Sequence, residues 1–259
     1  MNIVVLVKQV PDTWSERKLR AEDSTLDRDA ADAVINELDD YAIEEGLRLQ
    51  EAHGGEVTIV SMGPEKAADA IRKALSMGAD KAVHVLDDGL RGSDGLVTSA
   101  VLAKVLERTG FDLVVLGSES TDARMGTLAA MLAERLNVPQ LSFAAKVETD
   151  GTQISIHRQA DYGYDTVEAA LPAVVSVVEK INEPRYPSFK GIMAAKKKPV
   201  EVLSLDDLGL DASQAGLGAS ATEVVSFANR PPRAAGTIVT DEGEGGAAAA
   251  EFLAARKFI

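Results

Sequence analysis

The chain has 259 residues, 46% of them hydrophobic and 4% aromatic, and is long enough to bury a substantial core in one or two domains. Its 27 basic and 41 acidic residues give a formal charge of -14, which opposes non-specific binding to nucleic acid or to an anionic membrane surface. It has no cysteine and only three histidines, which excludes disulfides and thiolate metal sites and leaves little for zinc or serine-hydrolase chemistry. We therefore expect no metal site.

No apolar run approaches the roughly 20 residues that a membrane-spanning helix needs. The first eight residues lack the basic region and the cleavage site of a signal peptide. We therefore expect a cytoplasmic protein without membrane insertion and without a nucleic-acid partner.

The first half of the chain alternates between apolar strands and amphipathic helices. Residues 3–7 form a continuous β-branched apolar run, typical of a strand buried on both faces of a parallel sheet. A polar loop from Pro11 to about Arg28 and a long helix over residues 30–52 follow. Further strands are predicted at 57–61, 82–86 and 113–116, and further helices at 64–77 and 93–108. Strands separated by helices predict a parallel sheet with right-handed crossovers.

After a helix expected over residues 126–137, the hydrophobic period changes towards two. Strands are predicted over residues 142–148 and 153–158, with Asp150-Gly151 as a hairpin signal between them. Residues 172–179 form another apolar strand. Antiparallel strands should therefore extend one edge of the parallel sheet.

These elements predict an α/β fold with a Rossmann-like parallel sheet, antiparallel edge strands and an extended C-terminal arm. The main α/β domain should comprise residues 1–183 and be followed by a Pro- and Lys-containing segment, 184–203. Residues 204–259 are rich in Gly and Ala and carry only short apolar pieces, so they form either an arm that packs on a partner or a partly disordered terminus.

The loop after the fourth predicted strand is the strongest candidate for a ligand site. Open parallel sheets bind ligands outside the carboxyl ends of their strands. Residues 117–128 combine a glycine at the strand end, a hydroxyl and carboxylate cluster and Gly126 near a helix start, where free N–H groups attract phosphate. The loop matches neither common phosphate-binding motif, and such a cluster is also typical of a plain helix N-cap. Gly63, after the second strand, should face the same crevice.

Other polar residues indicate no catalytic site. His84 alternates with valines in a strand and is interpreted as a packed or hydrogen-bonded histidine. Taken alone, residues 36–39 are typical of a solvated helix face. Asp161, Asp165 and Glu168 surround a Tyr-Gly-Tyr sequence that favours a turn. We assign no acid and base pair.

One stretch carries a specific family resemblance. Residues 171–198 join a strand, an Asn182-Glu-Pro-Arg185-Tyr turn and a Lys-rich loop, and this combination resembles the electron-transfer flavoprotein family, in particular its beta subunits. The resemblance extends in family order to about Asn229. It includes residues 5–12, 36–45, 60–64, 74–80 and the loop that begins at Gly117.

The resemblance implies a Rossmann-like fold of the adenine-nucleotide-binding type, with residues 1–183 as the nucleotide-binding domain. It also implies a heterodimer in which a larger alpha subunit holds most of the FAD while this subunit buries a structural AMP. It implies an electron carrier without a catalytic acid or base of its own. Electrons would come from dehydrogenases such as acyl-CoA dehydrogenases and pass to a quinone oxidoreductase. The implied cofactor-binding residues are Leu6, Asn36, Glu37, Leu38, Asp39, Met62, Gly117, Ser118, Glu119, Ser120, Thr121, Asp122, Ala123, Arg124, Met125, Gly126, Thr127 and Leu128. Among them, the N–H groups of residues 126–128 would face the AMP phosphate.

The resemblance also assigns a partner recognition loop to residues 184–203 and implies that residues 204–259 pack on the alpha subunit. Phe189 occupies the anchor position, which is commonly leucine. Trp14 lies either toward the flavin, as the family implies, or simply anchors its loop. The implied docking residues are Phe189, Ile192, Met193, Lys196, Lys197 and Lys198.

Two alternatives stay open. A related branch of the family performs electron bifurcation and holds a second FAD where AMP otherwise sits, and Arg124 is compatible with the additional phosphate. A stand-alone AMP- or ATP-binding protein of the stress-protein kind shares the parallel sheet and a phosphate loop after its fourth strand. That alternative leaves residues 182–198 unexplained.

Overall fold

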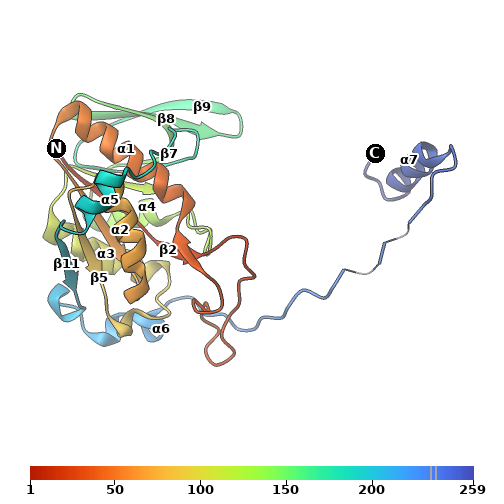
Figure 1. Cartoon of the computed structure of the whole chain (residues 1–259), viewed down its shortest axis with the longest axis horizontal. Helices are drawn as coiled ribbons and strands as arrows, with labels where there is room; N and C mark the ends of the chain where they lie inside the picture. Colours follow the sequence, from red (N-terminus) through yellow and green to blue (C-terminus); the bar gives the residue numbers. More distant parts are fainter. Residues whose placement is uncertain (234, 237) are drawn as a thin grey trace. The chain divides into compact units, whose positions relative to one another are not determined.

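The computed structural model describes residues 1–233, 235–236 and 238–259. Ala234 and Thr237, which fall within the expected C-terminal arm, lie outside the described residues. The chain divides into two compact units, Met1–Val224 and Val225–Ile259. The first contains a nine-stranded sheet, and the second contains helix α7 (Gly245–Ala255) (Figure 1). Across the described residues, no helix combines the length and apolar character needed to cross a membrane. The expected cytoplasmic location stays a prediction.

The sheet has seven parallel strands followed by an antiparallel extension. Its central strand, β1, lies between β4 and β6, and the extension runs from β7 through β8 to β9. This arrangement confirms the predicted fold class, a mostly parallel α/β sheet with antiparallel edge strands. The strands in spatial order are β11 (Val200–Leu203), β5 (Lys81–Val85), β4 (Glu56–Met62), β1 (Asn2–Leu6), β6 (Leu113–Gly117), β10 (Ala173–Val177), β7 (Gln140–Thr149), β8 (Gln153–Ala160) and β9 (Gly163–Ala170).

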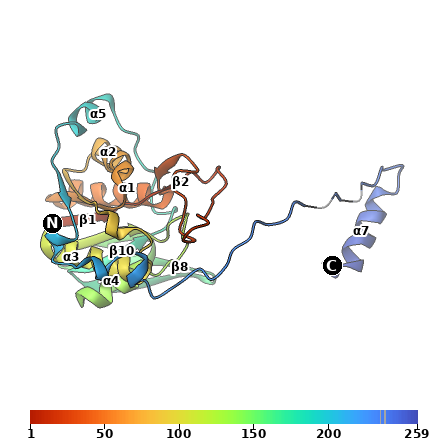
Figure 2. The same cartoon turned by 90° about the horizontal axis from the view of Figure 1, so that it is seen from below.

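Helices cover both faces of the sheet (Figure 2). On one face, α1 (Glu37–His53) and α2 (Ala68–Met77) pack against alternate residues of β1, Ile3 and Val5. On the other, α3 (Gly95–Thr109) and α4 (Leu128–Leu136) form a second apolar cluster with the intervening residues. The two clusters explain why β1 is apolar at successive positions, since both of its faces are buried.

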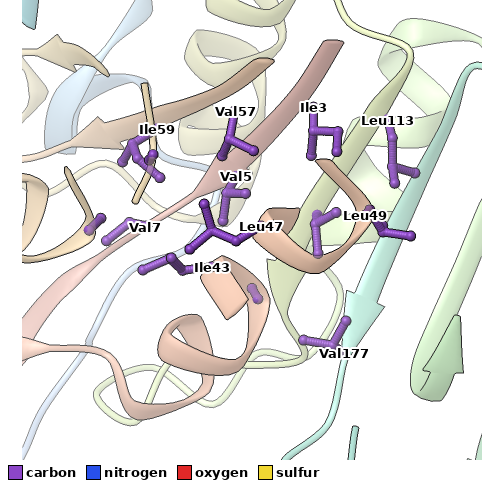
Figure 3. Close-up of a cluster of buried hydrophobic side chains, with 14 of the residues drawn as sticks. Ile3, Val5, Val7, Ile43, Leu47, Leu49, Val57, Ile59, Leu113 and Val177 are labelled. Carbon is purple, nitrogen blue, oxygen red and sulfur yellow. The ribbon is translucent and has the colours of Figure 1, made fainter. Parts of the chain in front are cut away.

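Helix α1 approaches the central strands closely. Figure 3 shows Val5 and Leu47 side by side, with Ile43 and Val57 in the same cluster. A Cβ atom at Gly46 would lie 2.8 Å from Cγ2 of Val5, so a glycine is needed for this contact. Full burial of each large aliphatic side chain contributes about 1.5–3 kcal/mol, so this interface fixes α1 firmly on the sheet.

The predicted turn between residues 161 and 165 is present at 161–162, where β8 and β9 form a hairpin. Two predicted helices begin later than expected. The helix expected from residue 30 begins at Glu37, because residues Ala33–Ile35 form strand β3, which pairs with β2 (Gln9–Pro11). The helix expected from Gly126 begins two residues later, since Gly126 has a φ of +66°.

The sheet unit also extends beyond the boundary expected at residue 183. Within the segment 184–203, residues Phe189–Ala195 form the short helix α5, and β11 then pairs in parallel with β5. Leu205 and Ala215 bury their side chains in the same cluster as α3 and α4, ahead of the short helix α6 (Gly216–Ala219). The observed division therefore falls after Val224, and the separate C-terminal unit begins later than residue 204.

Candidate functional site

The carboxyl ends of the central parallel strands lie at one edge of the sheet. Leu6, Met62 and Gly117 are the last residues of β1, β4 and β6, which are neighbours in the sheet. The structure thus brings together three of the loops that follow the predicted strands, where the strand-end rule places ligands. The first helical turn of α1 lies against the same edge, because Asn36 N–H donates a hydrogen bond to the carbonyl of Lys8.

Asn36 holds the loop that follows β6. Its Nδ2 donates to the carbonyl oxygen of Glu119 at 3.0 Å, and its Oδ1 accepts a hydrogen bond from the Thr121 N–H at 3.0 Å. Only 1% of the residue is exposed, so the interpretation of residues 36–39 as a solvated helix face is wrong for Asn36. The Asn36 side chain therefore fixes the backbone of this loop at two residues, Glu119 and Thr121.

Asp39 is buried beside Asn36 and bonds both to it and to the backbone of the chain after β1. One carboxylate oxygen accepts the Lys8 backbone N–H at 2.7 Å, and the other accepts Asn36 Nδ2 at 2.9 Å. A Cβ at Gly117 would lie 2.6 Å from the second oxygen, so only glycine fits between β6 and α1. Burial raises the pKa of Asp39 to about 7, although its hydrogen bonds and the Lys8 charge act in the opposite direction.

A buried ion pair forms beside this loop. The Lys8 ammonium lies 2.7 Å from Asp122 Oδ1 and 3.2 Å from Ser120 Oγ, and the Asp122 side chain is only 2% exposed. Arg28 places its guanidinium 3.6 Å from the other Asp122 oxygen. Burial by itself would raise the pKa of Asp122, but the Lys8 charge, hydrogen bonds and Arg28 outweigh it and lower the pKa. Asp122 therefore stays ionised and ties residues 117–128 to the ends of β1 and the β2–β3 loop.

The loop ends at the N-terminus of α4. Thr127 is the N-cap residue, and within the described chain its side chain makes no capping hydrogen bond. The plain N-cap interpretation is therefore not observed, and the first-turn N–H groups keep no side-chain cap. In the described parts of the chain, Ser61 Oγ and Thr121 Oγ1 are buried without a hydrogen-bond partner. Such atoms fit a polar ligand, since a buried hydroxyl without a partner is costly.

The remaining residues of the loop point in different directions. Met125 packs against Gly95, at the start of α3, where a Cβ would collide with its sulfur. Arg124 adopts a φ of +48°, and its exposed guanidinium has Glu119 4.0 Å away. Lys8 and Arg28 were missing from the predicted site. Lys8 follows the first strand directly, so the strand-end rule already pointed to it, whereas Arg28 carries no such signal.

The predicted docking residues lie on and just after α5. Phe189 is 81% exposed, and Ile192 and Met193 are also exposed, which is unusual for large apolar side chains that lie close together. Lys196 and Lys197 are exposed beside them.

Lys198 is engaged within the chain. Its ammonium donates to the carbonyl oxygens of Leu75 at 3.0 Å, Gly78 at 2.9 Å and Ala79 at 2.5 Å, at the C-terminus of α2. A cation there satisfies carbonyls that have no helical partner. The structure therefore gives Lys198 a role in holding β11 and α2 together.

Comparisons with known proteins agree with this architecture. The family model described as "Electron transfer flavoprotein domain" matches residues 23–208. The "Electron transfer flavoprotein subunit beta" of Mycobacterium tuberculosis is 53% identical over 264 residues, covering 100% of this chain and 99% of the relative. The protein of the same description from Bacillus subtilis is 41% identical over 216 residues, 83% of each chain. The "Caffeyl-CoA reductase-Etf complex subunit CarD" of Acetobacterium woodii is 33% identical over 242 residues, 93% of this chain and 92% of the relative.

Fold and site together define an open α/β protein with hydrogen-bonded polar residues gathered at the carboxyl ends of its central strands. The chain belongs to the electron transfer flavoprotein family and groups with its beta subunits. The predicted family resemblance is thereby confirmed. Membership indicates an electron-carrier subunit and an alpha subunit as its partner.

Replacing Lys198 by Met should destabilise the sheet unit, because three carbonyls lose a charged donor. We expect the free energy of unfolding to fall by about 1–3 kcal/mol, measured by urea denaturation. Lys197→Met is the matched control and should change it by less than about 0.5 kcal/mol. Equal effects of the two substitutions would contradict the assigned role of Lys198.

Asp39 should give the protein a characteristic pH dependence. Because its pKa in the folded state is raised to about 7, the folded protein keeps a proton that the unfolded chain loses near pH 4. The stability due to this group is complete below the unfolded pKa and is lost as the pH rises through about 7. The free energy of unfolding, relative to Asp39→Asn, should therefore fall by up to about 1.4 kcal/mol per pH unit between pH 4 and 7.

The control is Asp150→Asn. The hydrogen bond from the Gln153 N–H and those from Thr152 lower the pKa of Asp150 to about 2, so both its pKa values lie below this range. In urea denaturation at several pH values, the difference in free energy of unfolding between wild type and Asp150→Asn should stay constant from pH 4 to 7. If the difference in free energy of unfolding between wild type and Asp39→Asn is also constant from pH 4 to 7, Asp39 does not keep a proton in the folded protein.

Proposed function

We propose that this chain binds a structural AMP in the crevice at the ends of β1, β4 and β6. The observation that most supports it is the loop 117–128, which Asn36 and Asp122 hold in place and which leads into the uncapped N-terminus of α4. A helix N-terminus with free N–H groups is a favourable phosphate site. The two buried hydroxyls without a partner, Ser61 and Thr121, offer further hydrogen bonds.

Each group at this site has a defined role in the proposal. The N–H groups of residues 126–128 bind the AMP phosphate, and Leu6 and Met62 flank the adenosine. Asn36 and Asp39 act on the loop rather than on the nucleotide, because the polar atoms of both side chains already bond within the protein. Lys8, although paired with Asp122, adds a positive charge at the crevice.

We further propose that an alpha subunit holds most of the FAD and completes a heterodimer with this chain. The bound flavin accepts and releases the electrons. The unit Val225–Ile259 exposes apolar side chains, including Phe252 and Ile259, and packs on the alpha subunit in this proposal. The heterodimer carries electrons from dehydrogenases, such as acyl-CoA dehydrogenases, to a quinone oxidoreductase in the cytoplasmic compartment.

The surface around α5 is the proposed docking site for the dehydrogenase. Phe189 supplies an exposed aromatic anchor, Ile192 and Met193 extend the apolar contact, and Lys196 and Lys197 attract an acidic partner. Lys198 should contribute less to partner binding than Lys196 and Lys197, because its ammonium already bonds to α2.

A bifurcating flavoprotein with a second FAD in the crevice is the alternative. The name of the Acetobacterium relative, a subunit of a caffeyl-CoA reductase complex, and the exposed Arg124 guanidinium favour it. The full-length match to electron transfer flavoprotein beta subunits weighs against a stand-alone nucleotide sensor. The three hypotheses differ in the nucleotides that the purified protein contains.

Nucleotide content therefore tests the proposal directly. The chain is co-expressed with its alpha subunit, the complex is denatured, and released AMP and FAD are quantified by chromatography. We expect one AMP and one FAD per heterodimer. Two FAD without AMP would establish the bifurcating alternative, and a chain that forms no complex and carries no flavin would support the sensor.

Phe189→Ala tests the docking site. Loss of an aromatic anchor at the centre of an interface typically costs more than about 2 kcal/mol of binding free energy. Reduction of the flavoprotein by an acyl-CoA dehydrogenase should therefore become much slower. Flavin and AMP content should stay unchanged, because Phe189 is exposed and distant in sequence from the crevice loops. Unaltered reduction kinetics, measured by stopped-flow absorbance, would refute the assignment.

A further inference from the structure

The segment that carries the docking residues is fastened to α1 where it leaves the sheet. After β10, Asn182 Nδ2 donates to the carbonyl of Tyr41 and to Glu45 Oε2, both at 3.1 Å. Both acceptors belong to α1. The chain therefore crosses this helix at a fixed place before it reaches Phe189.

Arg185 makes the strongest of these attachments. Its Nε lies 2.7 Å and its Nη2 3.2 Å from the two carboxylate oxygens of Glu44, and its own backbone N–H donates to Glu44 at 3.2 Å. The same guanidinium reaches Glu51 with Nη1 at 2.6 Å. A bidentate pair fixes orientation as well as distance.

Glu44 is an unusual partner for a surface loop, because its side chain is only 4% exposed. Burial by itself would raise the pKa of this carboxyl group, but the hydrogen bonds and charge of Arg185 outweigh burial and lower it. Arg48 also bonds to Glu44, at 2.9 Å, from the same helix. A buried carboxylate that depends on a loop arginine ties the position of the loop to the helix.

The far end of the segment is fixed in the same way. Gly191 of α5 lies against the carbonyl of Ser76, where a Cβ would collide, and Lys198 bonds to the end of α2. Between the two attachments, Tyr186 and Phe189 remain almost fully exposed. The exposed aromatic side chains thus sit on a segment that is held at both ends.

We propose that Arg185 is a positioning residue that holds the docking segment on α1 in its binding-competent place through the buried carboxylate of Glu44. The inference rests on the proposed docking function of α5. A segment ordered in advance loses less conformational entropy when a partner binds, so affinity is higher for the same contacts. Arg185 itself contacts α1 and acts on the partner only through Phe189 and its neighbours.

Arg185→Lys is the test variant, because it keeps a cation beside Glu44 but cannot form the bidentate pair. Arg48→Lys is the matched control, since Arg48 shares Glu44 but holds no atom of the segment. Both are made in the flavin-loaded heterodimer and assayed with an acyl-CoA dehydrogenase reduced by its acyl-CoA substrate. For Arg185→Lys we expect the KM for the flavoprotein to rise about 3- to 10-fold with kcat unchanged per flavin, and for Arg48→Lys less than about 2-fold.

Limited trypsin digestion gives an independent readout. Cleavage after Lys190 should become faster in Arg185→Lys than in wild type, while cleavage in Arg48→Lys should keep the wild-type rate. A purely stabilising salt bridge would lower the yield or the unfolding temperature of both variants without a selective change in KM. That result, or equal KM values for the two variants, would overturn the proposal.

Phe189→Ala separates this inference from the function on which it rests. If Phe189→Ala raises KM and Arg185→Lys does not, docking through α5 holds and the positioning role of Arg185 fails. If neither substitution changes KM, the docking function itself fails, and the positioning role fails with it.

Discussion

The buried contact between Asp39 and the ends of β1 and β6 is the constraint on which the site depends. The Asp39 carboxyl group accepts hydrogen bonds from the backbone N–H of Lys8, just after β1, and from the side-chain amide of Asn36. Asn36 then fixes the loop after β6 at two backbone positions. The first turn of α1 therefore positions the loop after β6, and Gly117 is needed because any side chain there would collide with the Asp39 carboxyl group.

Helix α1 contacts both of the proposed functional regions of the chain. Its apolar face packs on the central strands, its first turn holds the loop after β6, and Glu44 and Glu45 hold the segment that follows β10. This explains why an otherwise amphipathic helix buries several acidic side chains, each of which has a hydrogen-bond partner. The proposed nucleotide site and the proposed docking segment are thus both held by the same helix.

The sequence predicted the sheet and the position of the loops at its strand ends, because both follow from strong local patterns. Continuous apolar runs mark strands buried on two faces, and the strand-end rule locates the loops that follow them. It did not predict β3, since residues Ala33–Ile35 form a strand only through pairing with β2. Nor did periodicity reveal that Asn36 is buried or that Lys198 bonds to α2, because both depend on segments distant in the sequence.

A structure of the heterodimer determined with its bound nucleotides tests the central claim most directly. The account predicts AMP in the crevice, with its phosphate on the N–H groups of residues 126–128 and its adenosine between Leu6 and Met62. It also predicts that the hydrogen bonds of Asn36 to the carbonyl of Glu119 and the N–H of Thr121 remain. A nucleotide bound elsewhere on the chain, or a loop 117–128 that abandons Asn36 on binding, would contradict it.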